Sequence, residues 1–263
     1  MVLSTLNRLT GNHFGASGPA NEILTECIRL RNLYASRQQS FRVWYDLLML
    51  KDSLAQANME SFVGNDPRTT WNMAVYLLTP KPLVHQVVST EGLPMSPATR
   101  EAAHLVQQYF GRLWSRINQQ NIYAGQPSWF SNFVGLLTIT GWYALPYLML
   151  PDGKPFVDYW NPATVFPEFE YSSNRELIKL ARIRKLSASQ AVAIAKAEGW
   201  AYNFTSRMGN SVTEYQLWVK DVDSIHHGVV FDNTVVKSLA PVSGLTRIPV
   251  LVGYVGGLPD DGA

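Results

Sequence analysis

The stretch INQQNIYAGQPSWFSNFVGLLTITGWYALPYLMLP, residues 117–151, carries no charged side chain. An uncharged segment of this length has to be buried, either inside the fold or against another protein. It leads through the turn Pro151–Lys154 into the aromatic, proline-punctuated segment Asp158–Glu170. Because Gly153 suits a left-handed turn position, we expect a β-hairpin at this point.

Upstream of this stretch, apolar residues recur at helical spacing. Residues 1–20 are rich in Gly, Ser and Asn and predict a flexible arm. We expect a long helix over residues 21–59, which the polar patch Ala35–Ser40 could interrupt. Shorter helices are expected from Pro67 to the stop at Pro80–Pro82, over residues 98–118 and over residues 129–139. Asp66 is the expected N-cap of the second helix and Ser96 that of the third.

Downstream, the pattern changes to strands. They are expected over residues 142–150, 176–186, 212–220, 225–231, 234–238 and 248–255. One short helix, residues 187–199, interrupts them, with Ser187 and Gln190 at capping-box spacing. This order predicts an α+β fold in which a helical N-terminal half, residues 21–140, packs with a strand-rich C-terminal half, residues 141–263.

Composition narrows the functional classes. Charged residues make up 16% of the 263 residues and aromatics 12%, with eight Trp, which suits a subunit that hides its surface against neighbours. An ordinary monomer with a Trp-rich core is the alternative. The net charge of +2 offers no field for wrapping nucleic acid. A single cysteine, Cys27, excludes an intrachain disulfide and a multi-thiolate metal site. The apolar run over residues 134–150 is too short and too polar to span a membrane.

Catalytic signatures are missing: the sequence has no phosphate-binding Gly-rich loop with Lys, no HExxH and no GxSxG. One cluster, Asp221, Asp223, His226 and His227, could ligate a divalent metal in a hydrolase or nuclease. A turn between two strands explains the same residues, and strand alternation would send the two histidines to opposite faces. We therefore expect no enzyme activity and no cofactor, and keep the metal-dependent enzyme as the alternative.

A basic run near residue 180 offers a second candidate. Arg182, Arg184 and Lys185 could contact phosphates, because Arg and Lys neutralise backbone charge whatever the base sequence. Alternatively, residues 176–186 form an edge strand that its own positive charges keep soluble.

Aromatic residues crowd the hairpin region. Aromatics at this density fill a core or anchor a protein interface. The candidates for an oligomer or capsid interface are Trp129, Phe133, Trp142, Tyr159, Trp160 and Phe166.

Four phrases in order together resemble the portal proteins of tailed bacteriophages. They are FVGNDPR (62–68) followed by WNMAVYLL (71–78), LTITGWY (137–143), DYWNPATVFP (158–167), and RIPVLVG (247–253) followed by Gly256-Gly257. Each also has a physical meaning: Pro162, for example, ends a strand and forces a turn. By this resemblance, residues 1–263 would form the wing-like body of the family, leading to a stem that this chain does not contain.

The resemblance implies a structural role without bond chemistry. Such a subunit forms a ring, usually of twelve copies, at the single capsid vertex through which double-stranded DNA is packaged and ejected. Its partners would be the major capsid protein, the terminase and the tail or adaptor proteins. It would be located in the virion and assembled in the bacterial cytoplasm. A capsid-associated scaffold or adaptor is a further alternative.

Overall fold

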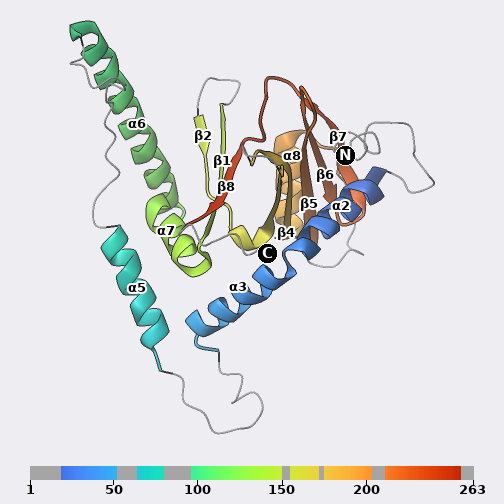
Figure 1. The fold of residues 1–263 in the computed structure, drawn as a ribbon, viewed down its shortest axis with the longest axis horizontal. Coiled ribbons are helices and arrows are strands. Elements are labelled where there is room, and N and C mark those ends of the chain that lie inside the picture. The colour runs from blue at the N-terminus through green and yellow to red at the C-terminus, as the bar shows by residue number, and fades with distance from the viewer. Residues whose placement is uncertain are drawn as a thin grey trace. The chain divides into compact units, whose positions relative to one another are not determined.

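The computed structural model describes residues 19–51, 64–79, 96–149, 155–171, 175–202 and 211–255. It confirms the mixed α+β order, with helices over residues 22–140 followed by a strand-rich region of two antiparallel sheets (Figure 1). Residues 1–18 of the predicted arm, the Pro80–Pro82 stop, the hairpin turn and Gly256-Gly257 lie outside the described residues, whereas the last two residues of the predicted arm, Pro19 and Ala20, begin a helix. The chain divides into two compact units: residues 1–42 with 142–263 form the first, and residues 43–141 the second.

The larger sheet of the first unit has five antiparallel strands in the order β3-β4-β5-β6-β7. Their bounds are Val165–Phe169, Leu177–Ser187, Ser211–Lys220, Ile225–Phe231 and Thr234–Val242. The prediction of an edge strand at residues 176–186 is wrong, because β4 lies between β3 and β5. Charged side chains on β4 are tolerated there because Lys179 and Arg184 form ion pairs, Arg182 lies over the Trp160 ring, and Lys185 is exposed.

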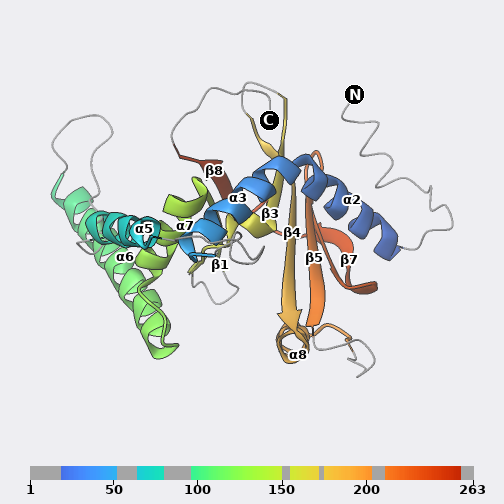
Figure 2. The same ribbon diagram turned by 90° about the horizontal axis from the view of Figure 1, so that it is seen from below.

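Helix α2 (Pro19–Leu33) crosses one face of this sheet (Figure 2). Its residues Ile23, Cys27 and Leu30 are buried against the sheet. Helix and sheet approach closely at Gly228, where an added Cβ would lie 2.8 Å from Cδ1 of Ile23. Burial raises the pKa of the Cys27 thiol to about 12, so this cysteine is part of the core and is no nucleophile at neutral pH.

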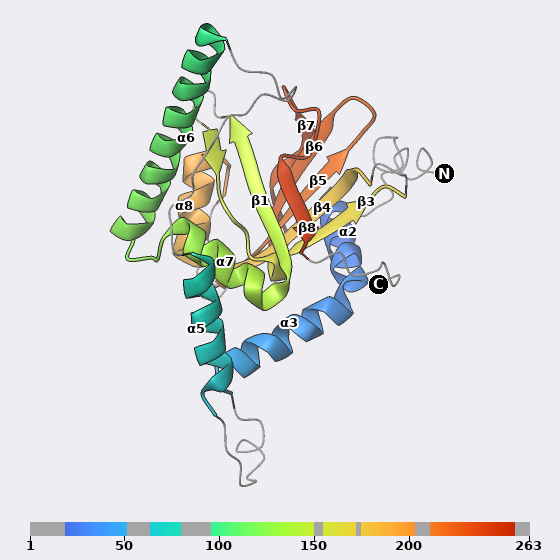
Figure 3. The same ribbon diagram turned by 60° about the vertical axis from the view of Figure 1, so that its left-hand side comes forward.

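The opposite face carries a three-stranded sheet at one end and helix α8 (Ala188–Glu198) at the other (Figure 3). The small sheet has the order β2-β1-β8, and its strands are Pro155–Val157, Trp142–Met149 and Val250–Tyr254. Ala144 and Val250 of this sheet pack on Val165 and Leu180 of the larger one.

Local signals predicted several elements closely. The Ser187 hydroxyl accepts from the backbone N–H of Gln190 (3.3 Å), and the Gln190 amide oxygen accepts from the N–H of Ser187 (2.9 Å), which confirms the capping box. The turn at Asp232-Asn233 joins β6 and β7 as expected. The expected helix over residues 21–59 is instead two helices, α2 and α3 (Ala35–Leu48), because the chain turns at Tyr34.

The second unit contains helices α5 (Asp66–Leu78), α6 (Pro97–Tyr123) and α7 (Trp129–Thr140). Asn65 rather than Asp66 occupies the N-cap of α5, whereas the Ser96 cap of α6 is confirmed. The indole N–H of Trp71 on α5 donates to the Gly135 carbonyl of α7 at 3.1 Å. No helix among the described residues is both long and apolar enough to cross a membrane.

Candidate functional site

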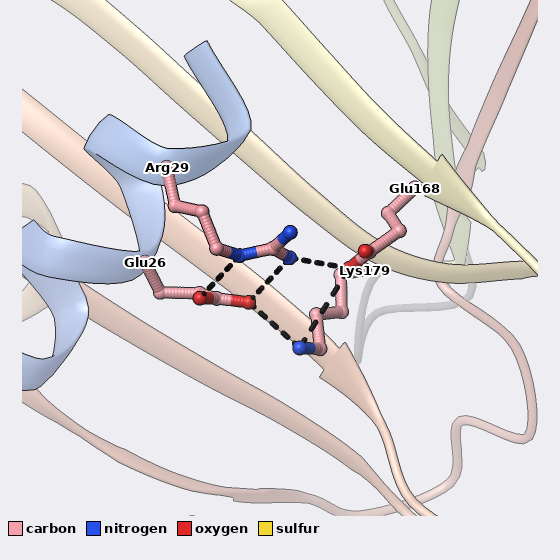
Figure 4. A network of polar contacts seen from close by, with 4 residues as sticks. All are labelled: Glu26, Arg29, Glu168 and Lys179. Carbon is pink, nitrogen blue, oxygen red and sulfur yellow. Dashed lines mark hydrogen bonds and ion pairs between the residues drawn. The ribbon is translucent and has the colours of Figure 1, made fainter. Parts of the chain in front are cut away.

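Four charged side chains tie α2 to the larger sheet (Figure 4). Arg29 Nε donates to Glu26 at 2.8 Å, and Arg29 Nη2 donates to Glu168 at 2.7 Å. Lys179 Nζ donates to Glu26 at 2.7 Å and lies 3.6 Å from Glu168. Burial raises the pKa of Glu26, but the hydrogen bonds from Arg29 and Lys179 outweigh it and hold that pKa below its usual value. Two cations match two carboxylates, so the network positions the helix and leaves no charge for a ligand.

A further cation, Arg37 of α3, lies among aromatic rings. Its guanidinium carbon is 4.0 Å from the ring centre of Tyr34 and 4.6 Å from that of Trp142. Its Nη2 donates to the Val165 carbonyl at 2.5 Å. Burial lowers the pKa of Arg37 to about 10, so the group stays charged at neutral pH. The rings and the carbonyl hold that charge and fix the start of α3 on the sheet.

The predicted phosphate-binding residues are separated by the alternation of β4. The guanidinium of Arg182 lies 4.0 Å above the Trp160 ring. Arg184 forms an ion pair with the fully buried Glu214, which also accepts from the Gln216 amide at 2.9 Å. Both arginines face the side that carries the small sheet and α8. Lys185, one residue further, is exposed and belongs to the other face of the strand.

Next to them, on the same face, lies His227 of β6. Its ring stacks on Trp218 of β5, with centroids 3.9 Å apart and planes 11° apart. Lys237 Nζ lies 3.0 Å from Nδ1 of His227, and since an ammonium only donates, Nδ1 is the acceptor. Burial, with the Lys237 charge adding to it, lowers the pKa of His227 to about 3. The ring is therefore neutral and carries its hydrogen on Nε2.

Three donors on this face have no acceptor. Arg182 Nε, Trp218 Nε1 and His227 Nε2 are buried, and within the described part of the chain none has a hydrogen-bond partner. We call the set Arg182, Arg184, Gln216, Trp218, His227 and Lys237 the donor face. The sequence did not predict that these six residues lie together on one face. The available signal was polar residues at inward positions of strands that otherwise bury apolar side chains.

The other candidate cluster is not assembled as a metal site. Asp221 Oδ1 accepts from the N–H of Val222 in the turn, and Ser224 hydrogen-bonds to Nε2 of His226 at 3.0 Å. His227 points to the opposite face from His226, as the alternation predicted. Among the described residues, no group of three or more His, Cys, Asp or Glu side chains could hold a metal ion.

The six predicted interface aromatics are all at least partly covered by the chain itself. Trp129 and Phe166 are buried, while Phe133, Trp142, Tyr159 and Trp160 are half-buried. Trp129 lies 4.9 Å from the ring of Trp114 on α6 and stacks on Phe133 at 5.5 Å. Phe166 packs beneath α2. The sequence could not separate core from interface here, because both require the same residue types.

Exposed apolar side chains lie elsewhere, on the helices of the second unit. On α6, Leu105 is 61% exposed and Tyr109 46%, with Val106 and Phe110 beside them. On α5 the exposed ones are Met73, Tyr76, Leu77 and Leu78. In the first unit, the small sheet exposes Tyr147, Leu148, Met149, Phe156, Leu251 and Tyr254. The four residues on α6 recur at helical spacing and form one stripe, which we call the α6 stripe.

Comparison of the sequence with protein families and with curated proteins gives no relative from which to transfer a role. A scan against protein-family models finds no family that matches the chain, and a search of curated proteins finds no match.

Proposed function

We propose that this protein is a structural subunit of a phage portal ring, the head–tail connector at the unique capsid vertex. The proposal rests on two observations: the resemblance of the four sequence phrases to portal proteins, and the exposed apolar side chains on the surface of the chain. In this role the protein forms a channel for double-stranded DNA, contacts the major capsid protein, and docks the terminase and the tail or adaptor proteins. The chemistry of packaging then belongs to the terminase.

The observation that carries the proposal is the α6 stripe. Monomeric proteins rarely leave contiguous apolar patches exposed, and such patches mark protein–protein contacts. A stripe of Leu105, Val106, Tyr109 and Phe110 on one side of a 27-residue helix is a surface that a neighbouring copy can cover. The aromatic members suit an interface anchor, because they bury much area at small entropic cost.

Composition supports the same role. A ring subunit shares a large interface with each neighbour, and obligate interfaces of this kind bury on the order of 2,000–5,000 Å². They are depleted in charged residues at their centre. Within the uncharged segment over residues 117–151, the side chains of Tyr147, Leu148 and Met149 remain exposed at the end of β1. The low charge content therefore extends to the surface and is not confined to the core.

Substitutions on α6 test the role of the stripe. Val106→Asp places a carboxylate in the stripe, and we expect it to shift the chain from rings to smaller species. His104→Asp is the matched control. His104 is also exposed on α6, but the two-residue offset turns it by about 200° around the helix axis, to the other side. We expect this variant to assemble like the wild type.

The readout is particle mass by light scattering, together with negative-stain images and circular dichroism. Loss of rings in Val106→Asp alone, with an unchanged spectrum, supports the stripe as an interface. If both variants form rings equally well, the α6 stripe is not part of the interface between copies. If neither the wild type nor either variant assembles, the proposal that the protein forms a ring is contradicted.

A further inference from the structure

We propose that the donor face binds a small oxyanion, a phosphate or a carboxylate group, through the side chains of Arg182, Trp218 and His227. This site lies in the first unit and is separate from the α6 stripe. It requires neither a ring nor DNA.

The hydrogen bonding of the face carries the proposal. All three unpartnered atoms are donors, since the Lys237 contact fixes His227 with its hydrogen on Nε2. A buried donor without an acceptor costs free energy, so native structures satisfy it with protein, water or ligand. His227 is 8% exposed, so its ring has little access to bulk water. A ligand that offers only hydrogen-bond acceptors would satisfy these donors.

The three donors occupy neighbouring ladder positions. Trp218 pairs directly with His227 across β5 and β6, and Arg182 pairs with Gln216, two residues from Trp218 on the same face. Trp218 is therefore a neighbour of both other donors, at about 5–8 Å along and across the ladder, whereas Arg182 and His227 lie on either side of β5. An oxyanion has several lone pairs in different directions and is therefore suited to accept from more than one of them.

The charges of the face also favour an anion. Three cations, Arg182, Arg184 and Lys237, face two carboxylates, Glu214 and Asp158. Glu214 is already occupied by Arg184 and Gln216, and Asp158 acts on Arg182 through its charge. Burial and the nearby Arg184 lower the pKa of Arg182 to about 10, so its guanidinium remains charged at neutral pH. A partly buried cation paired to no carboxylate gains from a bound anion.

The burial of these donors limits the ligand to a small group. A duplex reaches exposed Arg and Lys side chains with its phosphates, whereas here the donor atoms are buried. Arg184, Gln216 and Lys237 at the margin of the face are partly exposed. Lys185, the exposed member of these three basic residues, lies on the other side of β4.

Isothermal titration calorimetry of the full chain tests the site, with inorganic phosphate and acetate as separate titrants at constant ionic strength. We expect at least one of the two anions to bind, with a stoichiometry of one ion per chain. Arg182→Met keeps a long side chain over Trp160 and removes the charge, so binding should be lost. Trp218→Phe keeps a ring against His227 but removes one donor, so Kd should rise roughly tenfold.

Lys185→Gln is the matched control, because it removes a positive charge three residues from Arg182, from an exposed side chain on the other face of β4; its Kd should stay within about twofold of the wild type. Binding of phosphate alone or acetate alone identifies the oxyanion. No binding of either, with water satisfying the donors, overturns the proposal. So does equal weakening by Lys185→Gln and Arg182→Met, which would indicate general electrostatics. If Arg182→Met does not fold, an unchanged Kd in Trp218→Phe overturns it as well.

Discussion

Trp218 and His227 stack face to face across two neighbouring strands, with ring centroids 3.9 Å apart and planes 11° apart. This pair fixes the protonation state of the histidine. Its ring is enclosed by the indole on one side and reached by Lys237 at Nδ1, so a second positive charge is unfavourable there. The contact therefore makes the stability of the first unit dependent on pH.

The folded-state pKa of His227, about 3, lies below the ordinary value near 6.5. The unfolded chain then binds more protons than the folded one between these values, so stability is fully present above about pH 6.5 and is lost as pH falls toward 3. For this group alone, the loss between pH 7 and pH 5 should be about 2 kcal/mol.

Urea unfolding at both pH values, for the wild type and for His227→Gln, measures this loss. The variant should be less stable at pH 7 but should lack about 2 kcal/mol of the pH-dependent change. Identical pH dependence in the two proteins would show that His227 is not buried in the neutral form.

The Glu26 network gives a prediction on stability. Glu26→Gln removes the carboxylate charge and leaves the buried Lys179 ammonium with the 3.6 Å contact to Glu168 as its remaining ion pair. We expect a loss of about 1–3 kcal/mol. The double variant Glu26→Leu with Lys179→Met should recover most of it, because a buried ion pair can be replaced by apolar groups of similar size. Thermal unfolding measures both, with Glu22→Gln in the same helix as control. A double variant less stable than either single one would contradict this reading.

The close packing of α2 against the larger sheet gives another prediction on stability. Gly228→Ala places a methyl group 2.8 Å from Cδ1 of Ile23 and 3.1 Å from the backbone of Leu239, and should cost about 1–3 kcal/mol. Ile23→Val removes the clashing methyl. The double variant should thus lose less stability than the sum of the single losses. Strictly additive losses, measured by urea unfolding, would place the strain elsewhere.

Arg37 provides a test of aromatic packing around a cation. Arg37→Lys keeps the charge but loses the planar group that lies on Tyr34 and Trp142 and reaches the Val165 carbonyl. We expect a loss of about 1–3 kcal/mol. Arg31→Lys, an exposed position on α2, should change the melting temperature little. An equal effect of the two substitutions would mean that the rings do not stabilise the guanidinium.

Prediction from sequence succeeded where the signal is local. The capping residues Ser96 and Ser187 fix the starts of α6 and α8, and the strand Ile225–Phe231 follows directly from its composition. Strand order is different, because it depends on contacts between distant segments. Nothing within residues 176–186 reveals that β3 and β5 flank them, so the charges of β4 were explained as protection of an edge.

The same limit applies to the sites. Arg182, Arg184 and Lys185 form one run in sequence, but a strand sends alternate residues to opposite faces, and the run is divided. Trp218 and His227 meet only through the β5–β6 register. The interface aromatics illustrate a further difficulty: Trp129 and an exposed residue such as Tyr109 belong to the same residue class, and only tertiary packing determines which is covered.

The mass of the full chain in solution tests the proposed role most directly. A portal subunit should form closed particles of about twelve copies of the 29.5 kDa chain, or about 350 kDa, with a central hole in negative-stain images. A single 29.5 kDa species at every concentration would contradict it.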